Sequence, residues 1–143
     1  MRFAMNLETE FLKMTPQEFE RVTTMTDRWE AAVNKLVGMT EDGLLRWAPN
    51  DLLRHLRPDM ALIGDAYVAT VNGKQVAIYE YRYKYFRDAK HRVWETGLRI
   101  EFITPNLERE WTWPATHSRF LLLETIRYGG SQANQFLERF LTQ

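Results

Sequence analysis

The dipeptide Asn72-Gly73 constrains the fold most, because it lies between two segments in which β-prone residues alternate. A two-residue type I′ turn needs positive φ at both central positions, and Asn followed by Gly meets that need best. We therefore expect an antiparallel hairpin at this point. Together with the strand-like segments around it, the hairpin predicts an antiparallel meander of about five strands. The expected strands cover residues 44–47, 66–71, 75–86, 93–103 and 110–113.

Alternation along these strands predicts which side chains share a face. In the second hairpin strand, the residues Tyr79, Tyr81, Tyr83 and Tyr85 point one way, and the charged residues between them point the other. We expect the tyrosines to share the helix-covered face of the sheet with residues of the next strand, and the charged sets to face water. The expected neighbours of the tyrosines are Trp94, Leu98 and Phe102; the expected solvent-facing residues include Glu95, Arg99 and Glu101.

A long helix is expected before the sheet. The run Thr15-Pro16-Gln17-Glu18 has a capping Thr, a Pro at the first helical position and a Glu that closes a capping box. Apolar residues then recur at helical spacing through Trp29, Val33 and Leu36, which predicts one buried stripe. Gly38 is expected to end this helix.

Further helical segments are expected on both sides of the strands. Asn50 can cap a short helix that runs to Leu56, and the segment 120–128 is an apolar helix. Ser131 can cap a last helix, whose apolar residues are expected on its buried side. These residues are Phe136, Leu137, Phe140 and Leu141.

Segregated helices and strands predict an α+β fold, with an N-terminal long helix and C-terminal helices packed on one face of an antiparallel sheet. We expect a single domain over residues 1–143, in which 1–14 form a less ordered N-terminal arm. No apolar run approaches the ~20 residues of a membrane span. The sequence has no cysteine, and a cytoplasmic location is expected.

The sequence offers little sign of catalysis. Without cysteine it has neither thiolate metal ligands nor a cysteine nucleophile, and no glycine-rich phosphate loop occurs. On a strand, His91 and Glu95 would lie ~13 Å apart, too far to share a metal. We therefore predict no metal, no cofactor and, on balance, no enzyme. An enzyme whose site combines His91, His117 and Glu95 from across the fold is the third hypothesis.

The hairpin region is basic although the net charge of the chain is zero. Between residues 74 and 99, seven Lys and Arg residues stand against three acidic ones. Basic residues interleaved with aromatic ones can bind single-stranded nucleic acid by phosphate neutralisation and base stacking. Buried tyrosines could not stack on bases, so this is the second hypothesis. Its residues are Arg82, Lys84, Arg87, Lys90 and Arg92.

Tryptophan content leads to the first hypothesis. Trp111 and Trp113 lie on one face of a short strand, and Trp47 lies on another short strand. Exposed tryptophans anchor protein interfaces, and weak charge repulsion favours association. We therefore predict a small, non-catalytic interaction or regulatory module that binds another protein, including a second copy of itself. Nucleic acid is the less favoured partner, and no membrane contact is expected.

Overall fold

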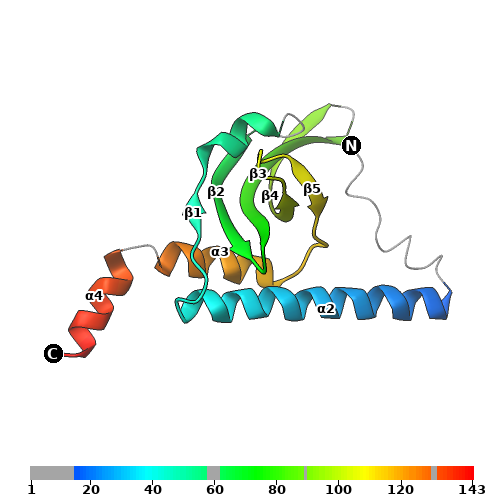
Figure 1. Ribbon diagram of the computed structural model, residues 1–143. Coiled ribbons are helices and arrows are strands. Elements are labelled where there is room, and N and C mark those ends of the chain that lie inside the picture. Colours follow the sequence, from blue (N-terminus) through cyan, green and yellow to red (C-terminus); the bar gives the residue numbers. More distant parts are fainter. Residues whose placement is uncertain (1–14, 58–61, 89, 130–131) are drawn as a thin grey trace.

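The computed structural model describes residues 15–57, 62–88, 90–129 and 132–143. It confirms the α+β fold, with a five-stranded antiparallel sheet in the order β1-β2-β3-β4-β5 and helices before and after it (Figure 1). The expected arm at 1–14 and the expected cap Ser131 lie outside the described residues. The elements are α2 (Pro16–Glu41), β1 (Ala48–Pro49), the 3-10 helix η1 (Asp51–Leu56), β2 (Leu62–Val71), β3 (Lys74–Asp88), β4 (His91–Ile103), β5 (Arg109–Thr112), α3 (Ser118–Gly129) and α4 (Gln132–Leu141).

Helix α2 begins with the predicted capping box. The Thr15 hydroxyl accepts a hydrogen bond from the Glu18 N–H at 3.1 Å, and the Thr15 N–H donates to the Glu18 carboxylate at 3.2 Å. The expected end at Gly38 was wrong, because the helix continues to Glu41. The exit occurs instead at Gly43, whose φ of 74° is the left-handed conformation that glycine adopts without strain.

The expected strand at residues 44–47 was also wrong. The backbone N–H groups of Leu44 and Leu45 both donate to the Met39 carbonyl, at 2.9 and 3.2 Å, so they complete the end of α2. The paired segment is β1, residues Ala48–Pro49. The short helix predicted after it is present as η1, and the Asn50 side chain caps it by accepting from the Leu52 N–H at 3.0 Å.

The central hairpin is confirmed, with φ angles of 49° at Asn72 and 78° at Gly73. Strands β3 and β4 continue well beyond their neighbours. Pairing of β2 with β3 ends at Arg82, and pairing of β5 with β4 covers only the Glu101–Ile103 end. Residues 82–88 and 90–96 therefore form a two-stranded ribbon, which we call the arm.

The face assignment of the tyrosines was wrong. In the observed register Tyr79 pairs with Arg99, and Tyr81 pairs with Gly97. Directly paired residues point to the same face, so the tyrosines share a face with Arg99 and Glu101. A register irregularity between Phe86 and Asp88 sets this alignment at the tip, and a one-residue difference in register exchanges the two faces of a strand.

Both faces of the sheet consequently carry a core. Aliphatic residues such as Ile78 and Ile100 pack against Val33 of α2 and Leu122 of α3. The opposite face buries Tyr79 under Leu53 of η1. Figure 1 shows α2 running past the sheet, with α3 beside it. Of the helices that the structure describes, none is long and apolar enough to cross a membrane.

A carboxylate of α2 fixes the start of α3. Glu30 accepts hydrogen bonds from the backbone N–H groups of His117 and Ser118 and from the Ser118 hydroxyl. Burial opposes ionisation of Glu30, but these hydrogen bonds outweigh it and hold the pKa of the Glu30 carboxyl below its ordinary value. Helices α2 and α3 are thus joined by these hydrogen bonds as well as by apolar packing.

Helix α4 was expected to bury its apolar side, and this was wrong. Figure 1 shows α4 projecting from the body beyond the end of α3. Its only substantial neighbour among the described elements is α3. The side chains of Phe136, Leu137, Phe140 and Leu141 are all exposed. None of the core residues that the structure describes is grouped with α4, so the stripe stays uncovered by that part of the chain.

Candidate functional site

The three tryptophans predicted as an interface do not form one exposed surface. Trp113 is only 8% exposed and packs in the helix-covered core. Trp47 is half-buried, and its indole N–H donates to the Thr40 hydroxyl at 3.1 Å. Trp111 is 45% exposed, but its ring lies 5.2 Å from that of Trp29 on α2. The structure leaves Trp111 alone at the surface, beside α2.

The two histidines of the enzyme hypothesis, His91 and His117, lie at a turn between strands and at the start of a helix. At the tip of the arm, the His91 Nδ1 lies 2.9 Å from the Asp88 carboxylate. His117 uses its backbone N–H at the start of α3. Among the residues that the structure describes, no cluster of three or more His, Asp or Glu could hold a metal ion.

The five residues predicted for polyanion binding all belong to the arm. Arg82 and Lys84 lie on β3, with their charged groups each 5.2 Å from the centre of the Trp94 ring. Arg87 and Lys90 are exposed near the tip, and Arg92 is exposed on β4. The structure therefore brings these cations together on one ribbon, and it adds an aromatic ring to them.

A buried ion network, which the sequence did not reveal, lies under η1. Glu101 is fully buried, and its carboxylate accepts hydrogen bonds from Arg57, Arg109 and the Tyr79 hydroxyl. Burial and, next, the negative charge of Glu101 raise the pKa of the Tyr79 phenol. Arg57 closes the network from the end of η1. All four groups are engaged with one another, so the network holds the fold together and offers no vacant group for a ligand.

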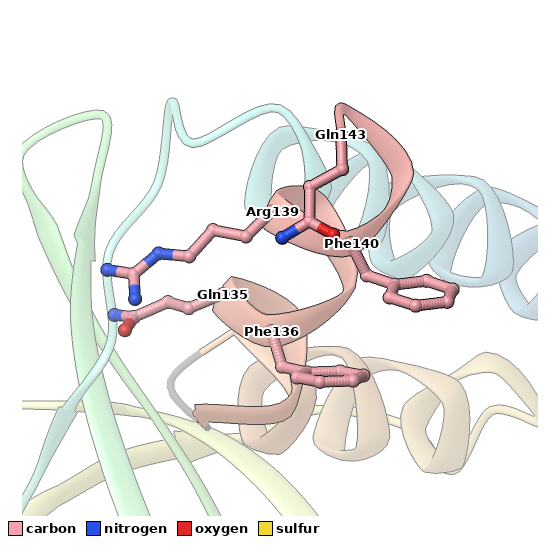
Figure 2. A pocket seen from close by; sticks show the side chains of 5 residues that line it. All are labelled: Gln135, Phe136, Arg139, Phe140 and Gln143. Carbon is pink, nitrogen blue, oxygen red and sulfur yellow. The ribbon is translucent and has the colours of Figure 1, made fainter.

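Among the residues that the structure describes, an exposed apolar stripe runs along α4, formed by Phe136, Leu137, Phe140 and Leu141. These side chains are between 41% and 71% exposed. The rings of Phe136 and Phe140 are stacked, with centroids 5.7 Å apart. Figure 2 shows both rings on one side of the helix, while Gln135 and Arg139 extend from the other. Sequence periodicity predicted this stripe correctly, but not its exposure.

A groove lies beside the root of α4. It has a volume of about 700 Å³ and runs between the end of α2 and the outer side of α3. Leu121 and Tyr128 supply its apolar floor, and both are about half exposed. Carboxylates line its rim: Glu41, Asp42, Glu124 and Glu138. An apolar helix face and an apolar groove are thus presented by the same chain, side by side.

Comparison of the chain with protein-family models found no match, and comparisons with curated proteins and with solved structures found none either.

Proposed function

We propose that this chain is a non-catalytic interaction module that pairs with a second copy of itself through helix α4. The observation that carries the proposal is the exposed stripe on α4. Contiguous exposed apolar side chains mark interaction sites in proteins of this size. The stripe takes the place of the expected tryptophan contact, because Trp47 and Trp113 are engaged within the core.

The length of α4 supports a partner for this stripe. The helix has 10 residues, and helices shorter than ~12–15 residues are marginal in water without packing. Full burial of one Phe or Leu side chain contributes about 1.5–3 kcal/mol. A helix of this kind gains its stability by laying its apolar side into a groove, as helix-in-groove complexes do.

The chain's own groove supports a second copy as the partner. Its floor, formed by Leu121 and Tyr128, is apolar, as the stripe requires. Its rim carries Glu41, Asp42 and Glu124, together with Glu138 of α4, whereas Arg139 of α4 extends from the side of the helix opposite to the stripe. In a dimer with twofold symmetry this contact forms twice, because each copy supplies both the helix and the groove.

The molar mass in solution tests this proposal. By light scattering coupled to size-exclusion chromatography, we expect the full chain to have twice the mass of 17.1 kDa. We expect Phe136→Gln/Phe140→Gln to be a monomer, since two polar side chains would then enter an apolar groove. Leu52→Gln is the matched control, because Leu52 is 62% exposed but lies in η1, on the opposite face of the sheet.

Two results would overturn the proposal. One is a wild-type mass of 17.1 kDa at every concentration up to the millimolar range. The other is a dimer that persists in the double variant. If the double variant loses its far-ultraviolet circular dichroism, it is unfolded. Leu141→Gln, at the far end of the stripe, is then tested in its place. The expected cytoplasmic location and a regulatory role remain part of the proposal, supported by the absence of cysteine and of predicted catalytic groups.

A further inference from the structure

We propose that the arm is a binding site for single-stranded nucleic acid, in which Trp94 stacks on a base while Arg82 and Lys84 contact phosphates. This site is separate from α4 and independent of pairing between copies. Three features of the arm support the inference. The Trp94 ring is exposed, cations lie around it, and the nearest acidic side chains interact with other groups of the protein.

Trp94 is the exposed ring. It is 44% exposed although it lies on the same face of β4 as the core residues Leu98 and Ile100. The register explains this, because Trp94 pairs with Lys84 in the arm, beyond the region that the other strands border. An indole held on a strand loses little freedom on binding, and aromatic side chains of this kind are the platforms on which bases stack.

Two cations lie over the ring, so a base that stacks on Trp94 takes the place of at least one of them. The Arg82 guanidinium and the Lys84 ammonium each lie 5.2 Å from the Trp94 ring centre. Arg92 is two residues from Trp94 on β4 and therefore shares this face. A base that stacks on Trp94 would place its phosphates among these charges. Single-stranded nucleic acid supplies both parts, a π-face and regular phosphates, whereas other polyanions supply only charge.

Acidic groups do not cancel this charge. Glu80 is the nearest acidic residue along the same face of β3, and it is held by Arg127 of α3. Glu95 pairs with Tyr83 and so lies on the opposite face. Asp88 at the tip accepts from the N–H groups of Lys90 and His91, at 2.8 and 2.9 Å. The face of the arm is thus cationic around Trp94, where Arg82 and Lys84 lie.

This site differs from the one expected at the sequence level. There, the hypothesis covered the basic aromatic hairpin 79–94, with the tyrosines and Trp94 expected on the buried face. Tyr79 is fully buried. The ring of Tyr81 lies across Gly97, on the face opposite to Arg82 and Lys84. Trp94, expected under the helices, is the aromatic residue that the cations surround.

Fluorescence anisotropy of a labelled 20-nucleotide oligothymidine tests the site with the full chain. We expect binding that weakens steeply with salt, and a loss of about five- to a hundred-fold in Trp94→Leu, as removal of one stacking platform causes. Trp111→Leu is the matched control, because Trp111 is 45% exposed but lies on β5 against α2. Arg82→Gln/Lys84→Gln should lower the salt slope by about 1.4, or about 0.7 for each phosphate contact on a single strand.

The outcomes are distinct. No binding at low salt, or equal affinities for Trp94→Leu and Trp111→Leu, would overturn the proposal. Competition with heparin, which carries charge but no bases, distinguishes stacking from charge alone. If heparin competes fully, and if Trp94→Leu binds the oligonucleotide as wild type does, then the arm is a general polyanion surface. The proposal is wrong in that case. Retention of oligothymidine binding by Phe136→Gln/Phe140→Gln would show that the site does not depend on α4.

Discussion

Arg57 donates two hydrogen bonds to one carboxylate oxygen of Glu101, at 2.8 and 2.5 Å, across 44 residues of sequence. Neither side chain reaches solvent: Arg57 is 3% exposed and Glu101 is fully buried. This pair joins the end of η1 to the tyrosine-bearing face of the sheet. Together with the packing of Leu53 of η1 on Tyr79, the pair covers that face, which explains how the sheet can carry a core on both sides.

Arg57→Leu should therefore lower the free energy of unfolding by about 3–5 kcal/mol, because it leaves the Glu101 charge buried with fewer partners. Urea denaturation followed by circular dichroism would measure the loss. The double variant Arg57→Leu/Glu101→Leu should be more stable than the single variant, since it removes the unpaired charge as well. A double variant that is no more stable than Arg57→Leu would contradict this interpretation of the pair.

Glu30 makes stability depend on acid pH. Its folded-state pKa lies below its ordinary value of 4.5, so its contribution is fully present above pH 4.5 and is lost as the pH falls through the folded-state pKa. Glu30→Gln should cost about 1 kcal/mol at pH 7, as the loss of a helix cap does. The difference from wild type should shrink toward pH 3. Thermal unfolding at both pH values would check this, and a constant difference would refute it.

Gly97 should not tolerate a side chain. A Cβ at this position would lie 2.3 Å from the Tyr81 ring, which covers the glycine. We expect Gly97→Ala to cost about 1–3 kcal/mol through overpacking. Gly38→Ala is the matched control, because a Cβ there meets nothing within 4 Å and Gly38 is helical. That change should stabilise the protein by up to about 1 kcal/mol. Equal effects of the two substitutions on the melting temperature would contradict the close contact.

Local features of this fold could be predicted from sequence, because each depends on residues that are neighbours in the chain. The capping box of Thr15 and Glu18 and the turn at Asn72 and Gly73 are such features. Face assignment failed because the alignment of β3 with β4 depends on an irregularity at Asp88, which alternation alone does not fix.

The candidate sites were harder to predict because they depend on what remains uncovered. Periodicity identified the stripe of Phe136 and Phe140, yet only the assembled fold shows that these side chains are exposed. Trp94 has the pattern of a core residue, and its exposure follows from the length of the arm beyond β2 and β5. Glu101 looks like a surface residue until Arg57 is placed beside it.

Cross-linking between copies tests the central claim, that α4 lies in the groove of a second chain, most directly. The chain has no cysteine, so single substitutions give unique labels. Leu121→Cys marks the groove and Phe140→Cys marks the stripe, and the two variants are mixed and treated with a short bis-maleimide. The account predicts a covalent dimer that joins one variant to the other. No covalent dimer in the mixture, together with a cross-link confined to single chains of the Leu121→Cys/Phe140→Cys double variant, would contradict it.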